Sequence, residues 1–165
     1  MIEFGRLLTA MVTPFDEGGE IDYEQVRNLA KGLVASGSDG LIIGGTTGEA
    51  PSMSDEEKIR LFREVKEVVG DTASVIAGTT DNNHRKSIEL SKMAEDVGVD
   101  GILLTVPAYN KPQQEGLYQH YKAINDNTSI PIIIYNIPSR CVIDMSVDTM
   151  ARLFELKNIT GVKDA

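Results

Sequence analysis

Lys163 is the residue of this sequence with the clearest potential for covalent chemistry. It ends the apolar segment "ITGVK" (159–163). The neutral amine of a lysine that is partly desolvated between apolar side chains is a nucleophile, and it condenses with a keto group to form a Schiff base. A lone lysine at a strand end more often extends its charge past the strand into water. The residues that the fold places beside Lys163 must decide between these two interpretations.

The segment "GGTTGE" (44–49) has the residue types of a small-anion site. Its glycines can bring backbone N–H groups close to a ligand, and Thr46 and Thr47 add two hydroxyls, so a carboxylate would find several donors there. The segment lacks the GK[ST] ending of a P-loop and is not G-x-G-x-x-G, which disfavours nucleotide binding. The alternative is a tight turn whose threonines only cap a helix.

The segment "YNIPSR" (135–140) offers a proton donor and a cation. The Tyr135 phenol could pass protons while an imine forms, and Arg140, which follows a proline-fixed turn, could hold a carboxylate with two hydrogen bonds. The plainer alternatives are a tyrosine with a buried ring and a wet hydroxyl, and a surface arginine.

Charge and composition exclude several classes of partner. The net charge of −9 argues against nucleic acid and against anionic membranes, and no apolar run approaches the length of a membrane span. The start, "MIEFGRLLTAMVTPF", lacks the basic residues and long apolar stretch of a secretory signal. We therefore expect a cytoplasmic protein that binds neither nucleic acid nor membrane.

The histidines and the cysteine do not form a metal-binding pattern. His84, His120 and Cys141 are not spaced as ligands, so we expect no metal. A single cysteine cannot form an internal disulfide, which fits a reducing compartment, and Cys141 has no evident base partner in the sequence.

Six short apolar runs predict buried parallel strands, because they are continuous rather than alternating in hydrophobicity. The runs begin at Leu7, Gly40, Ser74, Gly101, Pro131 and Ile159. Five segments with helical period separate them, the second of them behind a capping-box pattern, Ser54…Glu57. Their apolar stripes include Met93 in the third and Val147, Ala151 and Phe154 in the fifth. This α/β pattern leaves a doubly wound sheet and a (β/α)8 barrel open, and in both the reactive residues meet at the carboxyl ends of the strands.

Four motifs in this order, "GGTTGE", "PAYNKPQQEGLYQHY", "IIIYNIPSR" and "GVKDA", resemble the dihydrodipicolinate synthase family. That family belongs to the pyruvate-dependent class I aldolases, which are (β/α)8 TIM barrels. The resemblance implies that residues 1–165 form one domain, a partial TIM barrel of the first five β/α units plus strand six, with about six strands and five helices. A complete barrel needs about 250 residues, so we expect "GVKDA" to mark a truncation boundary.

The resemblance also implies catalytic roles. Lys163 corresponds to the lysine that forms the Schiff base with pyruvate, and Tyr135 to the tyrosine that transfers protons. Thr46 would link Tyr135 to Tyr109 in a hydroxyl relay, and Tyr109 would reach in from a neighbouring subunit of a homo-oligomer.

The implied substrates are pyruvate and aspartate 4-semialdehyde. Thr47, with Gly45 beside it, would bind the pyruvate carboxylate, and Arg140 would receive the carboxylate of the semialdehyde. No metal or organic cofactor is needed, because the protonated imine accepts the electrons. The implied activity is a carbon–oxygen lyase of lysine and diaminopimelate biosynthesis, 4-hydroxy-tetrahydrodipicolinate synthase.

Other functions remain open at this stage. N-acetylneuraminate lyase and 2-keto-3-deoxy-gluconate aldolase use the same imine. A partial barrel could instead be a catalytically inactive fragment that only oligomerises, and a third alternative is an open-sheet domain that binds an anion through "GGTTGE".

Three departures from the family pattern stand out. The family usually has a second tyrosine where this chain has Ala108, and often has Thr-Gly where this chain has Cys141 and Val142. Members inhibited by lysine have acidic and aromatic residues where this chain has Lys86 and Ala108, whereas Asn82 matches. We therefore expect weak feedback by lysine.

Overall fold

Six parallel strands form a single sheet in residues 4–165, the part of the chain that this computed structural model describes. The first three residues of the segment "MIEFGRLLTAMVTPF" lie outside that range. The strands are β1 (Leu8–Ala10), β2 (Gly40–Ile43), β3 (Ser74–Gly78), β4 (Gly101–Thr105), β5 (Ile132–Asn136) and β6 (Ile159–Asp164). Each strand coincides with one of the six predicted apolar runs.

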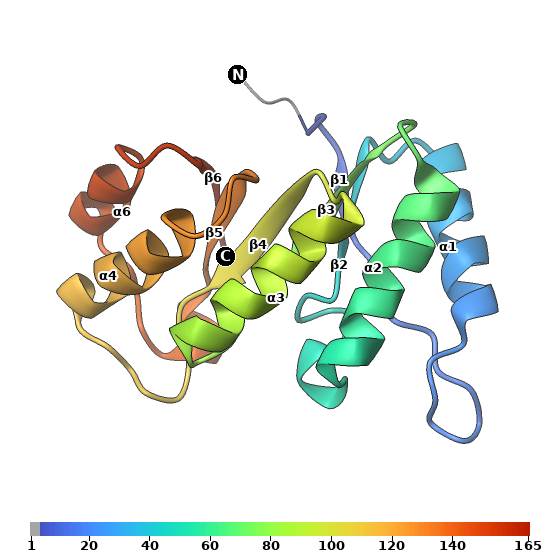
Figure 1. Ribbon diagram of the computed structural model, residues 1–165, viewed down its shortest axis with the longest axis horizontal. Coiled ribbons are helices and arrows are strands. Elements are labelled where there is room, and N and C mark those ends of the chain that lie inside the picture. The colour runs from blue at the N-terminus through green and yellow to red at the C-terminus, as the bar shows by residue number, and fades with distance from the viewer. Residues whose placement is uncertain (1–3) are drawn as a thin grey trace.

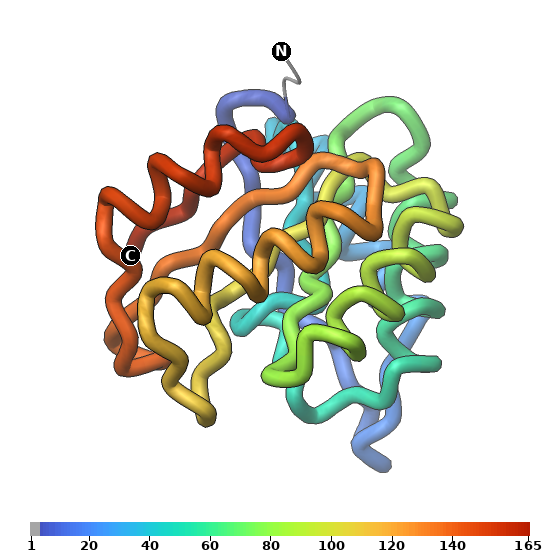
Figure 2. Tube along the Cα trace, turned by 60° about the vertical axis from the view of Figure 1, so that its left-hand side comes forward, coloured from blue at the N-terminus to red at the C-terminus, as the bar shows by residue number. Residues whose placement is uncertain are grey.

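The order of the strands decides between the two architectures. Along the sheet it is β1-β2-β3-β4-β5-β6, and each strand runs parallel to the one before it. A doubly wound sheet reverses its order near the middle, whereas a (β/α)8 barrel keeps the order of the chain. Helices α1, α2, α3, α4 and α6 also follow one another in chain order across the molecule (Figure 1), and the same succession of colours runs round it in Figure 2. The predicted partial barrel is confirmed.

Five helices connect the strands, as the periodicity predicts. They are α1 (Tyr23–Ala35), α2 (Asp55–Val69), α3 (His84–Val97), α4 (Gln114–Asn125) and α6 (Val147–Leu153). The capping box that begins α2 is present: the Glu57 N–H donates to Ser54 Oγ at 3.2 Å, and the Ser54 N–H donates to Glu57 Oε2 at 2.7 Å. The Ser54 N–H, and after it the Ser54 hydroxyl, hydrogen-bond the Glu57 carboxylate and thereby lower the pKa of that group.

The expected number of five helices is too low, because the described residues contain a sixth α-helix, α5 (Pro138–Cys141), and a short 3-10 helix, η1 (Ala50–Ser52). Each is a single turn with proline in its first two positions, where the missing N–H is not needed. A helix of one turn is too short to show a 3.6-residue period, so the hydrophobic pattern could not reveal it.

Two predicted apolar stripes are partly wrong. Met93 of α3 is 42% exposed, and in α6 Val147 and Phe154 are 78% and 43% exposed. Helix α6 instead buries Thr149 and Leu153. The Thr149 hydroxyl donates to Gln114 Oε1 at 2.8 Å, so the buried face of α6 combines an apolar residue with a polar contact to α4.

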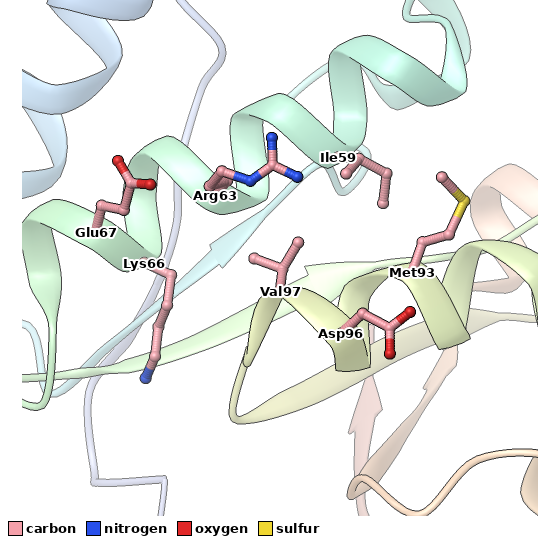
Figure 3. Close-up of a pocket in the computed structure, with 7 residues that line it drawn as sticks. All are labelled: Ile59, Arg63, Lys66, Glu67, Met93, Asp96 and Val97. Atoms are coloured by element: carbon pink, nitrogen blue, oxygen red, sulfur yellow. The ribbon is translucent and has the colours of Figure 1, made fainter.

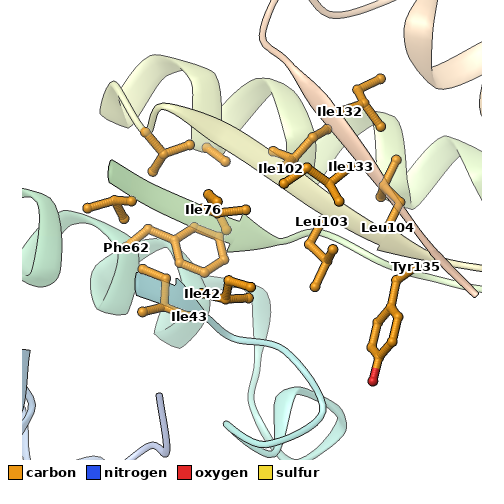
Figure 4. Packing of buried hydrophobic residues seen from close by; sticks show 14 of the residues in the cluster. Ile42, Ile43, Phe62, Ile76, Ile102, Leu103, Leu104, Ile132, Ile133 and Tyr135 are labelled. Atoms are coloured by element: carbon orange, nitrogen blue, oxygen red, sulfur yellow. The ribbon is translucent and has the colours of Figure 1, made fainter. Parts of the chain in front are cut away.

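The core lies between the sheet and the helices, and Figure 4 shows the Phe62 ring of α2 among the isoleucines of β2 and β3. Phe62 is fully buried. Two glycines allow the ends of β2 and β3 to meet beside it. A Cβ on Gly78 would lie 2.1 Å from the Gly44 carbonyl oxygen, and Gly44 has φ +58°, which glycine adopts without strain. The start of "GGTTGE" is therefore packed closely on β3 and α2.

Candidate functional site

Lys163 and Tyr135 are neighbours at the ends of β6 and β5. They face each other in the register of the two strands, and Lys163 Nζ lies 4.0 Å from the centroid of the Tyr135 ring. Tyr135 is 6% exposed, and Lys163 is half-buried. An ammonium group at this distance over an aromatic face is attracted by the ring electrons. The structure thus places beside the lysine a phenol that can exchange protons.

A cavity of 570 Å³ opens at the carboxyl ends of the strands, and Tyr135 is part of its wall. Gly45 and Thr46 of the "GGTTGE" turn line the same cavity, as do Thr80 and Thr105. Figure 4 shows the phenol of Tyr135 directed away from the packed aliphatic cluster. Three of the predicted site residues, from two separate elements, therefore share one cavity.

Lys163 lines a second, larger hollow of 840 Å³ on the inner face of the sheet. This hollow extends from the β1 segment to β6, and Leu103 lines both it and the cavity that holds Tyr135. Within residues 4–165, β1 and β6 each pair with a single strand. Lys163 therefore lies on the open inner face of the sheet, and its contact with the Tyr135 ring connects it to the smaller cavity.

The "GGTTGE" turn is held from the end of β1. The buried Thr13 hydroxyl donates to the Gly48 carbonyl at 2.7 Å, and the Glu49 N–H donates to the Thr46 carbonyl at 3.2 Å. These bonds fix the main chain, while the side chains of Thr46 and Thr47 remain exposed. The turn can therefore present its hydroxyls to a ligand without rearranging.

Asn136 is a site-organising residue that the sequence analysis missed. It is 3% exposed, and its side-chain NH₂ donates to Asp144 Oδ1 and to Asp164 Oδ1, both at 2.8 Å. Its Oδ1 accepts the Met145 N–H at 3.0 Å. Asn136 thereby ties the residue after Lys163 to the segment after α5. The sequence feature that could have revealed it is a polar residue at the carboxyl end of an apolar strand, directly after Tyr135.

The other predicted site residues lie outside the cavity. Tyr109 is 89% exposed on the loop between β4 and α4, and Thr47 and Arg140 are also exposed. None of the three is among the residues that line the 570 Å³ cavity. Asn82, Lys86 and Ala108, by contrast, do line it, so the residues considered for lysine feedback adjoin Tyr135.

Val142, which directly follows α5 and lies two residues after Arg140, has a strained backbone. Its φ is +68°, a region that β-branched residues rarely adopt, and its side chain is 69% exposed. We expect Val142→Gly to raise the free energy of unfolding by about 1 kcal/mol, the relief of strain exceeding the added freedom of the unfolded chain. Urea denaturation measures this. Val142→Ala should gain less, because it still carries a Cβ, and a lower midpoint for the glycine variant would contradict the prediction.

Cys141 is a buried thiol. The side chain is 5% exposed, and desolvation raises the pKa of its thiol.

Among residues 4–165 no group of three or more histidine, cysteine, aspartate or glutamate side chains could hold a metal ion. None of the helices in that range is long and apolar enough to cross a membrane.

A separate groove of 450 Å³ lies between α2 and α3 on the outside of the helical layer. Figure 3 shows its side chains, which include Arg63 and Glu67 from α2 and Met93 and Asp96 from α3. None of the predicted site residues lines this groove. The strand ends, where the lysine, the tyrosine and the glycine turn meet, remain the candidate site.

Comparisons with known proteins agree with this arrangement. The chain is 58% identical over 164 residues to the 4-hydroxy-tetrahydrodipicolinate synthase of Moorella thermoacetica, covering 99% of this chain and 56% of that protein. It is 52% identical, with the same coverage, to a synthase of Halalkalibacterium halodurans. The chain therefore spans a little over half the length of the curated relatives it matches.

Solved structures agree as well. The dihydrodipicolinate synthase DapA-2 of Bacillus anthracis superposes with a TM-score of 0.98 at 50% identity, covering 100% of this chain and 56% of that one. The Acinetobacter baumannii enzyme, solved in complex with pyruvate, gives 0.97 at 43% identity, covering 99% and 56%. A sequence model of the dihydrodipicolinate synthetase family matches residues 3–165. By this match, and by these relatives, the chain belongs to the dihydrodipicolinate synthetase family.

Proposed function

We propose that the chain carries the Schiff-base centre of a 4-hydroxy-tetrahydrodipicolinate synthase, which condenses pyruvate with aspartate 4-semialdehyde. The observation that carries the proposal is the pair formed by Lys163 and Tyr135, whose Nζ and ring centroid are 4.0 Å apart at the strand ends of a family member. The pyruvate complex of the Acinetobacter baumannii relative supports pyruvate as the first substrate.

The first step is imine formation. The neutral Lys163 amine attacks the keto carbon of pyruvate, a carbon–nitrogen bond forms, and the former keto oxygen leaves as water after it has been protonated. A proton donor must stand beside the amine for this, and the phenol of Tyr135, whose ring lies against the Lys163 amine, is such a group. Thr46, on the same cavity wall, and Tyr109 would connect Tyr135 to solvent.

The second step makes the carbon–carbon bond. The protonated imine withdraws electrons, the pyruvate methyl group loses a proton, and the resulting enamine carbon attacks the aldehyde. The amine of the semialdehyde then replaces Lys163 on the imine carbon, which closes the ring and releases the lysine. Thr47 and Gly45 would bind the pyruvate carboxylate and Arg140 the second carboxylate. Because the imine accepts the electrons, the reaction requires neither metal nor organic cofactor.

The proposal includes the assembly of several copies of the chain into a homo-oligomer. Tyr109 is 89% exposed, so its phenol can reach a site only if a second copy or a bound segment approaches it. In a homo-oligomer a second copy of the chain meets this requirement. We place this oligomer in the cytoplasm and treat each chain as one domain. The names of the relatives favour the synthase over N-acetylneuraminate lyase and 2-keto-3-deoxy-gluconate aldolase.

A non-catalytic assembly module is the second candidate. The unpaired edges of β1 and β6 in the described residues favour it, because such edges invite association. Anion binding through "GGTTGE" alone is the third candidate, and protection by phosphate rather than by pyruvate would favour it.

Borohydride reduction of the protein in the presence of pyruvate tests the proposal. Reduction converts the imine into a stable secondary amine, so intact mass spectrometry should show a single adduct that maps to Lys163. The adduct should vanish in Lys163→Ala and persist in Lys157→Ala, which removes an exposed lysine just before the same strand. Folded protein without an adduct, or with adducts spread over several lysines, would overturn the proposal and favour the assembly module.

A further inference from the structure

The loop after β3 holds the main chain of the loop that carries Tyr109. Asn82 Oδ1 accepts the Ala108 N–H at 2.9 Å and lies 3.5 Å from the Tyr109 nitrogen. In the opposite direction, Asn110 Nδ2 donates to the Asn82 carbonyl at 3.0 Å. One residue thus makes contacts with three consecutive residues across the gap between two βα-loops.

Asn82 is itself held on a fixed turn. The Asp81 N–H donates to Ser87 Oγ at 2.8 Å, and the Ser87 hydroxyl lies 3.2 Å from the Asp81 carbonyl that it bonds. Ser87 is fully buried in α3. The Asn83 N–H donates to Asp81 Oδ1 at 2.7 Å, which closes the turn. Hydrogen bonds therefore tie the main chain on either side of Asn82 to α3, while Asn82 itself bonds the loop of Tyr109.

Tyr109 depends on its main chain for its position. Its side chain is 89% exposed, so packing within residues 4–165 does not orient it. The direction in which an exposed side chain leaves the surface is set by its backbone, and the nearest side-chain anchor of that backbone is the Asn82 amide. A proton relay requires its members within hydrogen-bond reach, so a small displacement of the loop interrupts it.

We propose that Asn82 is a positioning residue for Tyr109: its side-chain oxygen holds the 108–109 main chain so that the Tyr109 phenol is presented in a fixed direction. The inference rests on the proposed function, in which Tyr109 ends the proton relay. Asn82 does not touch the reacting atoms in this role. It needs only an acceptor oxygen at the position of Oδ1.

Three variants test this role. Asn82→Ala removes the acceptor, and Asn82→Asp keeps an acceptor oxygen in the same place. Asn83→Ala is the matched control, because Asn83 is the adjacent asparagine and caps α3 by accepting the Arg85 N–H at 3.1 Å. The first readout is hydrogen–deuterium exchange of the Ala108 amide. We expect exchange to be roughly tenfold faster in Asn82→Ala, the loss of one net hydrogen bond, and unchanged in the other two variants.

The second readout follows proton transfer. The enamine exchanges the pyruvate methyl protons for deuterium in D₂O, and NMR measures the rate. We expect Asn82→Ala to slow this exchange roughly tenfold while the borohydride adduct at Lys163 still forms, and Asn82→Asp to restore the rate. A merely structural role would change the urea midpoint without this rescue.

The outcomes separate the two proposals. If the unmodified protein forms no Lys163 adduct, the proposed function fails, and amide exchange at Ala108 still decides whether Asn82 holds the loop. If the adduct forms but Asn82→Ala changes neither the amide exchange nor the methyl exchange, the positioning role is overturned. It is also overturned if Asn82→Asp behaves as Asn82→Ala does.

Discussion

Tyr135→Phe is expected to slow deuterium exchange into the pyruvate methyl group by roughly 10²- to 10⁴-fold, the usual contribution of a positioned general acid or base. The substitution keeps the aromatic ring against Lys163 and removes only the hydroxyl, so the 4.0 Å contact between Nζ and the ring remains possible. The loss is therefore one of proton transfer rather than of packing. NMR of pyruvate in D₂O with equal concentrations of each variant measures it.

Tyr118→Phe is the matched control for this variant. The Tyr118 ring also lies against a cation, with Arg152 Cζ 4.1 Å from its centroid, but it belongs to α4 and lines neither the cavity of Tyr135 nor the hollow of Lys163. Its exchange rate should equal that of the unmodified protein. Equal rates for Tyr135→Phe and the unmodified protein would remove Tyr135 from the mechanism.

Phe62→Ala is expected to lower the free energy of unfolding by about 3–5 kcal/mol, a large part of the roughly 5–15 kcal/mol typical of a domain. The ring is fully buried, and a Cβ placed on Gly44 would lie 2.9 Å from its Cε1. The variant therefore leaves a cavity directly beneath the "GGTTGE" turn. Urea denaturation followed by circular dichroism gives the stability, and borohydride trapping of pyruvate should also weaken as the turn loses its support.

Phe154→Ala provides the comparison for Phe62→Ala. Phe154 is 43% exposed at the end of α6, so removing its ring should cost less than about 1 kcal/mol and leave trapping unchanged. If the two variants lost equal amounts of unfolding free energy, the packing of Phe62 against Gly44 would not contribute more to stability than a partly exposed ring does.

The strands and their common polar edge were predictable because each strand is a continuous apolar run. The run that ends at Tyr135 and the run that ends at Lys163 are continuous in hydrophobicity, which is typical of parallel strands, and parallel strands present their carboxyl ends on one side. The sequence therefore predicted the proximity of these two residues. Strand β5 is buried along its whole length, whereas β6 is only partly covered, with Val162 44% exposed. The hydrophobic pattern does not indicate in which order the strands lie in the sheet. In the sequence only the motifs favour the barrel, and in the structure the strand order shows it.

The orientation of α6 and the organising role of Asn136 could not be predicted, because both depend on contacts between residues far apart in the chain. Val147 and Phe154 continue an apolar pattern, yet α6 buries Leu153 and Thr149 instead, and Thr149 bonds Gln114 of α4. Asn136 bonds residues eight and twenty-eight positions away. The hydrophobic pattern of a segment indicates which of its residues are buried, but it does not indicate which distant polar groups hydrogen-bond to one another.

The strict chain order of the sheet has a kinetic consequence. Each strand pairs with the one made just before it, and the helices in contact are likewise successive, apart from the one-turn α5 between α4 and α6. Every pairing thus closes a loop of one β/α unit, and the entropy lost on closing a loop grows only with the logarithm of its length. Topologies dominated by such short closures fold faster than those with distant pairings. A chain leaving the ribosome can therefore add its units in the order of synthesis, and Lys163 meets Tyr135 in the fifth of the five strand pairings among residues 4–165.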